Sequence, residues 1–146
     1  MTGAANPAAR HHWPLLLAAW ALAVLATGGA LFLGEVMGMV PCVLCWYQRI
    51  AMFPLALILG MAAYSDDRRG ALYALPLALA GLVLATYHSL LIAGYIPPAW
   101  IPCGAGASCA NQKVDILNGL QLPWLSLAAF AAITVFLLTY LRKVSR

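Results

Sequence analysis

The sequence predicts an all-α integral membrane protein, a bundle of four transmembrane helices with both termini in the cytoplasm. Hydrophobic residues make up 64% of the 146 residues and charged residues only 8%, a composition typical of membrane proteins rather than soluble domains. The chain also contains four apolar runs of about 20 residues, each enough to cross a hydrocarbon core about 30 Å thick. Because these runs consume most of the chain, we expect a single membrane domain over residues 1–146.

The four predicted spans cover residues 14–33, 43–64, 71–93 and 122–141. The first, third and fourth spans contain no Asp, Glu, Lys or Arg, and the second contains only Arg49. The first span, preceded by Arg10, could instead be a signal peptide. Its apolar run of about 20 residues exceeds the usual 7–15 or so of a signal peptide, so we expect a retained helix.

Positively charged residues lie mainly on one side of the predicted bundle. Six of the eight Lys and Arg residues lie on the side that holds both termini: Arg10, Arg68, Arg69, Arg142, Lys143 and Arg146. The connections on the opposite side, residues 34–42 and 94–121, contain one basic residue, Lys113. Because basic residues in short loops stay on the cytoplasmic side, both termini should be cytoplasmic. The formal charge of +4 thus reflects topology, and we expect contact with the lipid bilayer and no nucleic-acid partner.

All four cysteines then lie on the extracytoplasmic side, a compartment in which disulfides persist. Cys42 and Cys45 stand at the start of the second span, and Cys103 and Cys109 lie in the outer loop of residues 94–121. Four cysteines allow three pairings, and the short separations favour Cys42 with Cys45 and Cys103 with Cys109. Either pair could exchange with the other.

These pairs could be redox-active or could be structural crosslinks. A disulfide across two intervening residues closes a very small loop and stabilises a fold less than a long-range crosslink. The segment between Cys103 and Cys109 holds only Gly, Ala and Ser, which favours movement over packing, so we expect redox activity. We expect no metal, because neither spacing is a paired zinc-ribbon pattern. Haem attachment fails because Trp46 stands where the haem motif needs histidine.

Arg49 follows Cys45 by four residues and Cys42 by seven, so a helix brings all three to one face. Its charge and the positive end of the helix dipole should together favour a thiolate at Cys45. The alternative is that Arg49 only reaches out to the lipid head groups.

His88 and Arg49 should lie at similar depths in the membrane. At about 1.5 Å per residue, Arg49 is roughly 9 Å below the outer end of the second span and His88 roughly 8 Å below that of the third. His88 alone would be read as a helix-packing residue. A thiolate, a cation and an imidazole near the outer interface suit a lipid-soluble acceptor that becomes negatively charged on reduction, and a quinone fits that description.

The segment Val40–Arg49, VPCVLCWYQR, closely resembles the signature of the disulfide bond formation protein B family (DsbB). The resemblance extends to the Tyr87-His88 pair, the second cysteine pair and the Pro123-Trp124 entry to the last span. Only five residues separate Cys103 from Cys109, which resembles the short-loop, BdbC-like members of the family.

This resemblance implies a four-helix enzyme of the bacterial inner membrane, a protein-dithiol:quinone oxidoreductase that supports disulfide formation and folding of secreted proteins. Its partner would be a thioredoxin-fold thiol oxidase of the DsbA or BdbD type, and its electron acceptor ubiquinone or menaquinone. The implied quinone-binding residues are Arg49, which would stabilise the reduced quinone oxygen, and His88, close to the quinone ring.

The resemblance also implies an order of sulfur exchange. The partner's thiolate would attack Cys103 and release Cys109. Cys109 would then attack Cys42 and leave Cys45 as a thiolate beside the quinone.

Two other classes of protein share some of these features. Vitamin K epoxide reductase relatives also combine quinone and thiol chemistry, but their loop cysteines precede the Cys-x-x-Cys pair, whereas here the pair comes first. A non-enzymatic membrane scaffold held by structural disulfides would not need Arg49.

Overall fold

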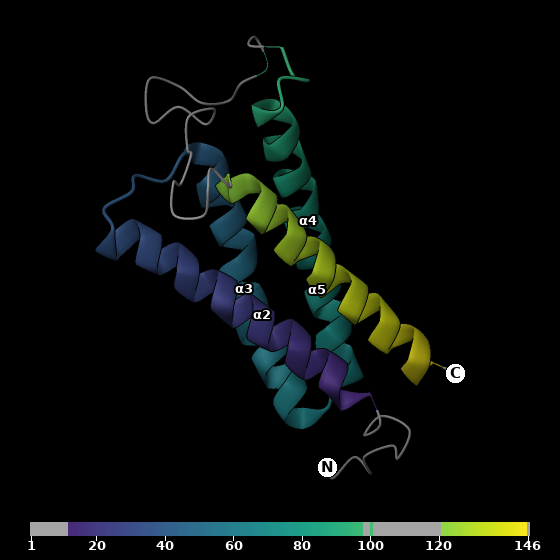
Figure 1. Ribbon diagram of the computed structural model, residues 1–146. Helices are drawn as coiled ribbons and strands as arrows, with labels where there is room; N and C mark the ends of the chain where they lie inside the picture. The colour runs from purple at the N-terminus through teal and green to yellow at the C-terminus, as the bar shows by residue number, and fades with distance from the viewer. Residues whose placement is uncertain (1–11, 98–99, 101–120, 146) are drawn as a thin grey trace.

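The computed structural model describes residues 12–97, 100 and 121–145. Over these residues the regular structure is entirely helical (Figure 1). The elements are α2 (Trp13–Leu31), the π-helical turn η1 (Phe32–Val36), α3 (Val43–Ser65), α4 (Arg68–Ile92) and α5 (Leu122–Val144). The predicted all-helical architecture with four long helices is confirmed.

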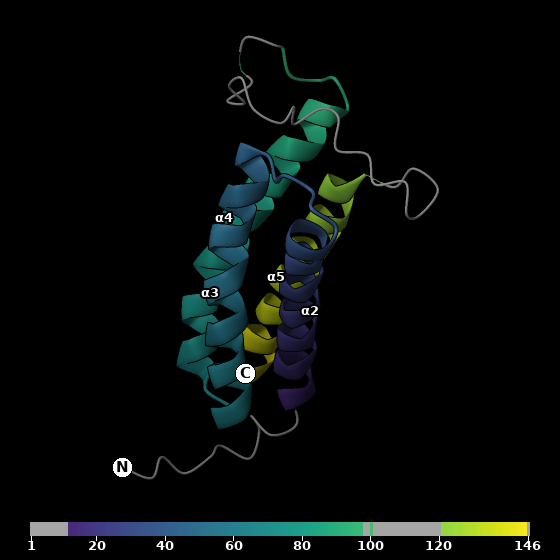
Figure 2. The same cartoon turned by 90° about the vertical axis from the view of Figure 1, so that its left-hand side faces the viewer.

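The four helices form a ring in which each helix packs against two neighbours. The packed pairs are α2 with α3, α3 with α4, α4 with α5, and α5 with α2. Figures 1 and 2 show that successive helices run in opposite directions, as in an up-and-down bundle. The start of α2, the turn between α3 and α4, and the end of α5 therefore meet at one end of the bundle (Figure 1).

All four helices are long and apolar enough to cross a membrane. The candidate spans are Trp13–Val36, Val43–Ser65, Arg68–Ile92 and Leu122–Val144. Large apolar side chains such as Leu57, Met61 and Val83 are about 70% exposed on the outside of the bundle, where lipid would cover them. The chain is thus a multi-pass membrane protein, and the cytoplasmic placement of its termini remains a prediction.

Small residues allow the helices to approach closely. Alanines are buried on the inner faces of α2, α3 and α4, and they pack around larger side chains that are fully buried, including Leu16, Leu55, Ile133 and Tyr140. Small residues are common where transmembrane helices meet, because they bring the backbones together. Tyr140 also donates a hydrogen bond to Asp66 in the turn between α3 and α4, at 3.2 Å.

Two helix ends fix the geometry of the end of the bundle that holds the Cys-x-x-Cys pair. Cys42 is the N-cap of α3, with extended backbone angles of φ −71° and ψ 168°, and it follows Pro41. Helix α2 ends in the π-helical turn η1, a local widening that is often found near functional sites.

Candidate functional site

The two described cysteines lie side by side at the first turn of α3. The Sγ atoms of Cys42 and Cys45 are 2.8 Å apart, which is too far for a disulfide between the two. The backbone N–H of Cys45 donates to Cys42 Sγ at 3.3 Å, so the sulfur of Cys42 occupies the position of a helix-capping acceptor. A disulfide needs sulfur atoms about 2.05 Å apart, so only a small movement would join the two.

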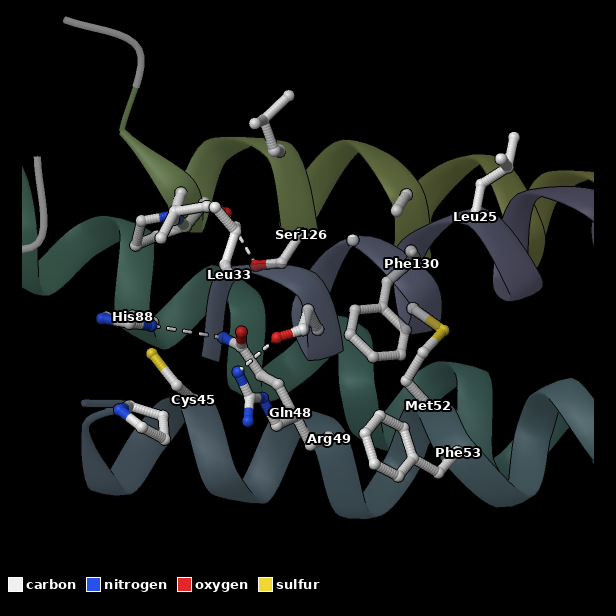
Figure 3. Close-up of a pocket in the computed structure, with 18 of the residues that line it drawn as sticks. Leu25, Leu33, Cys45, Gln48, Arg49, Met52, Phe53, His88, Ser126 and Phe130 are labelled. Carbon is white, nitrogen blue, oxygen red and sulfur yellow. Dashed lines mark hydrogen bonds between the residues drawn. The ribbon is translucent and has the colours of Figure 1, made fainter. Parts of the chain in front are cut away.

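His88 of α4 lies directly against this pair. The side chain is fully buried, and its Nε2 lies 3.9 Å from Cys42 Sγ. On the other side of the ring, Nδ1 lies 3.4 Å from Nε2 of Gln48, which comes from α3 and is also buried (Figure 3). Contact between α3 and α4 therefore places an imidazole within reach of the sulfur at the helix N-cap.

The hydrogen-bond donors around the cysteine pair converge on Cys42. The hydrogen bond from the Cys45 side chain is the main cause that lowers the pKa of the Cys42 thiol, from 9.0 to about 4. Burial opposes this shift, while the His88 side chain and the Cys45 backbone N–H reinforce it. The sequence predicts the thiolate at Cys45. In the dithiol form the donors favour Cys42 instead, chiefly the Cys45 side chain, with the backbone N–H at the helix cap as a smaller contribution.

Arg49 points toward α2. Its Nη2 donates to the backbone oxygen of Ala30 at 2.7 Å, and its guanidinium lies 5.5 Å from the centre of the Trp46 ring. Gly34 in η1 allows this approach, because a Cβ at that position would lie 3.1 Å from Nη2. The guanidinium is thus held between two helices rather than only reaching out to lipid head groups.

A cavity of about 370 Å³ opens beside these residues, mostly between α2, α3 and α5. Most of its lining is apolar. Figure 3 shows His88, Cys45, Gln48 and Arg49 gathered at one end, while Met52, Phe53 and Phe130 line the other. An apolar pocket of this size with a few polar groups at one end is typical of a small-molecule site.

The two cysteines stand differently toward this cavity. Cys45 is one of its lining residues, whereas Cys42 is buried against Leu44 and Leu91 and does not line it. One turn of helix therefore separates a sulfur that faces the cavity from a sulfur that faces His88.

The donor atoms of Cys42, Cys45 and His88 lie within 4.8 Å of one another, close enough to consider a metal ion. Two thiolates on one zinc ion would be separated by about 3.8 Å, given a Zn–S distance of about 2.3 Å and tetrahedral angles. The observed separation of 2.8 Å is shorter, so the two sulfurs as they lie do not have the spacing of two zinc ligands.

The structure brings Cys42, Cys45, Arg49 and His88 to one end of the bundle. The other two predicted catalytic residues, Cys103 and Cys109, lie outside the described residues. Sequence reasoning missed Gln48. Its spacing of three residues after Cys45 places both side chains on one helical face, which is the signal that could have identified it.

Comparisons with known proteins agree with this geometry. The family model described as "Disulfide bond formation protein DsbB" matches residues 10–140. A "Probable disulfide formation protein" of Metapseudomonas resinovorans is 46% identical over 134 residues, which cover 91% of this chain and 93% of that protein. No solved structure gives a significant match.

Two further relatives also match over most of their length. "Disulfide bond formation protein C" of Bacillus subtilis (strain 168) is 38% identical over 124 residues, which cover 84% of this chain and 88% of that protein. A "Probable disulfide formation protein" of Oceanobacillus iheyensis is 40% identical over 133 residues, 90% of this chain and 92% of that protein. Four membrane-spanning helices, a paired Cys-x-x-Cys at a helix N-terminus and a match over most of its length together show that this chain belongs to the DsbB family of disulfide bond formation proteins.

Proposed function

We propose that the protein is a thiol:quinone oxidoreductase that reoxidises a DsbA- or BdbD-like thioredoxin-fold oxidase and passes the electrons to a membrane quinone. The observation that carries the proposal is the position of Cys45, whose sulfur belongs both to the cysteine pair and to the wall of an apolar cavity. A scaffold held by structural disulfides would have no need for such a junction.

Electrons would enter by thiol–disulfide exchange. The partner's thiolate attacks Cys103 and releases Cys109 as a thiolate, which attacks Cys42 and releases Cys45. The partner's second thiol then closes the partner's own disulfide and releases Cys103. Finally Cys103 attacks Cys109, restores the outer disulfide and releases Cys42. The partner has lost two electrons and two protons, and the Cys42–Cys45 pair has gained them.

The side chains at α3 support two separate tasks within this cycle. The Cys45 backbone N–H and His88 lie against Cys42 and would stabilise it each time it leaves as a thiolate. While Cys42 would be bonded to Cys109, Cys45 would be the thiolate that this exchange released, and its side chain lines the cavity. The early expectation of a Cys45 thiolate thus applies to this intermediate.

The cavity fits a quinone. Its apolar walls suit a ring and the start of an isoprenoid tail, and its volume of about 370 Å³ lies within the range of about 300–1,000 Å³ for small-molecule sites. Arg49 would hold a ring oxygen at the polar end, where it supplies a positive charge for oxygen that becomes negative, and His88 would lie close to the ring. A bound quinone supplies a two-electron, two-proton acceptor, needed because a DsbA-type partner has a potential near −120 mV, far above ordinary disulfides at about −300 mV or lower.

Membrane topology follows from charge in this proposal. Arg68, Arg69, Arg142 and Lys143 lie at the end of the bundle opposite the cysteine pair. If that end is cytoplasmic, as the positive-inside rule predicts, the cysteines face the outside of a bacterial inner membrane. The partner oxidase would then meet them in an oxidising compartment.

Quinone reduction by the purified protein is the direct test. The full chain in detergent micelles is mixed with a reduced thioredoxin-fold oxidase and either ubiquinone-1 or a short-chain menaquinone, and quinone absorbance is followed. We expect reduction of at least one quinone by the wild-type protein and none by Cys45→Ser, because serine has a similar shape to cysteine but cannot form a disulfide. No reduction by wild type with either quinone would reject the proposal, and equal rates for both proteins would reject the role of Cys45.

A further inference from the structure

Three buried side chains form a continuous polar row at the site. Gln48 Nε2 lies 3.4 Å from His88 Nδ1, and His88 Nε2 lies 3.9 Å from Cys42 Sγ. Cys42, His88 and Gln48 are 2%, 0% and 8% exposed, so water has little access to any of them. Buried polar groups need partners, and the arrangement of hydrogen atoms along this row is therefore constrained.

The chemistry of the amide decides where the imidazole hydrogen lies. An amide nitrogen can only donate, so the ring nitrogen that faces it must accept. A neutral imidazole has one N–H, and when Nδ1 accepts, that hydrogen is on Nε2. The N–H of His88 then points toward Cys42 Sγ.

The opposite orientation of the Gln48 amide would leave no imidazole N–H facing Cys42 Sγ. With the Gln48 oxygen against the ring, Nδ1 would carry the hydrogen and Nε2 would turn a lone pair toward Cys42. Cys42 Sγ already accepts from the Cys45 N–H, and the donors around it lower the pKa of its thiol. An Nε2 lone pair that faces the Cys42 thiolate would be repulsive, whereas an Nε2–H donates to it, so the donor orientation of Gln48 is favoured.

We propose that Gln48 is a positioning residue that holds His88 in the tautomer whose Nε2–H faces Cys42 Sγ. Its consequence for turnover rests on the proposed function. In the exchange cycle, Cys42 leaves as a thiolate when the outer disulfide forms again, and the N–H of His88 stabilises that leaving sulfur. The imidazole donates a hydrogen bond in this step, and no proton is transferred to or from the ring.

Nitrogen NMR of the imidazole tests the tautomer directly. The full chain in detergent, in its reduced form and without quinone, is labelled with ¹⁵N in its three histidines, and His88→Asn identifies the His88 signals by their loss. We expect an acceptor-type shift for Nδ1 and a protonated-type shift for Nε2. Gln48→Met, which keeps the length of the side chain but removes the donor, should shift both signals toward a mixture of tautomers. Gln121→Met serves as the matched control, because Gln121 lies at the start of α5 outside the cavity lining.

A kinetic measurement tests the consequence for turnover. Gln48→Met should lower kcat by up to about tenfold, the loss expected for a weakened hydrogen bond to a charged group. A wild-type His88 protonated on Nδ1, or a Gln48→Met spectrum identical to that of wild type, would overturn the proposal. Because the wild-type spectrum is decisive alone, misfolding of a variant does not remove the test. A protein with the expected tautomer but no quinone reduction would instead reject the proposed function.

Discussion

Gly81 should control the depth of the cavity through its contact with Phe130. The Phe130 ring of α5 is 1% exposed, lines the cavity and packs tightly against Gly81 of α4. A Cβ at Gly81 would lie 2.5 Å from Phe130 Cδ1 and closer still to Cε1 and Cζ, whereas ordinary contacts begin near 3.4 Å. Gly81→Ala must therefore displace the ring, and the cavity that the ring lines is the open space beside it.

The free-energy cost of overpacking in Gly81→Ala should reduce both the stability of the protein and its affinity for quinone. Overpacking of a tight core costs about 1–3 kcal/mol, so the midpoint of thermal unfolding should fall. If about 1–2 kcal/mol of this falls on the occupied cavity, the apparent quinone KM should rise about 5–30-fold. The assays are thermal unfolding in detergent and steady-state quinone reduction.

Two further variants make the test specific. Gly28→Ala lies on α2, where a Cβ would meet nothing within 4 Å, so it should leave KM unchanged and stability equal or slightly higher. Phe130→Leu should relieve much of the penalty when combined with Gly81→Ala, because it removes the atoms in conflict. Wild-type stability and KM in Gly81→Ala, or strict additivity in the double variant, would refute the reasoning.

Three other outcomes follow from the site. Arg49→Met should lower quinone-dependent turnover by about 10²–10³-fold, the usual loss for one stabilising donor. Arg69→Met, at the far end of the bundle, should leave turnover unchanged. Equal rates for the two variants would exclude Arg49 from the quinone site. The lowered pKa of Cys42 predicts that alkylation of its thiolate in the reduced protein stays nearly constant from pH 8 to about 5 and falls as the pH drops through about 4, which peptide-resolved mass spectrometry can measure. Because the folded value lies below the 9.0 of the free thiol, the stability that this thiolate contributes should be full above about pH 9 and should decline toward pH 4. An alkylation midpoint near pH 9 would contradict both statements. Cys109→Ser should trap a mixed disulfide between Cys103 and a thioredoxin-fold protein on non-reducing gels, and absence of that species would count against the exchange order.

The membrane helices could be predicted from sequence because bilayer thickness sets a length that apolar runs must meet. Their ends were less accurate for physical reasons. The first span reaches Val36 rather than residue 33, because the π-helical turn η1 continues the helix. The third begins at Arg68 rather than residue 71, because the Asp67 side chain accepts from the backbone N–H groups of Arg69 and Gly70 and so caps the helix there.

Within the site, local spacing was informative and contacts between helices were not predictable. The intervals among Cys42, Cys45 and Arg49 correctly place them at one end of α3. Spacing alone could not show that the helix begins at Val43 and that Cys42 is therefore its capping residue. This position determines which sulfur receives the backbone N–H. Nor could it show that Gln48 meets His88, because that contact depends on how α3 packs against α4.

The helix N-terminus explains how one motif can serve two kinds of chemistry. A Cys-x-x-Cys pair at the start of a helix places its first sulfur outside the helical body, at the cap, and its second sulfur one turn inside. The cap position gives Cys42 a backbone donor and a neighbouring imidazole, which would make it a good leaving group in the proposed sulfur exchange. The position inside the helix turns Cys45 toward an apolar cavity that sulfur exchange does not require. The two sulfurs lie 2.8 Å apart, so in the proposed cycle only a small movement would be needed for electrons to pass from one environment to the other.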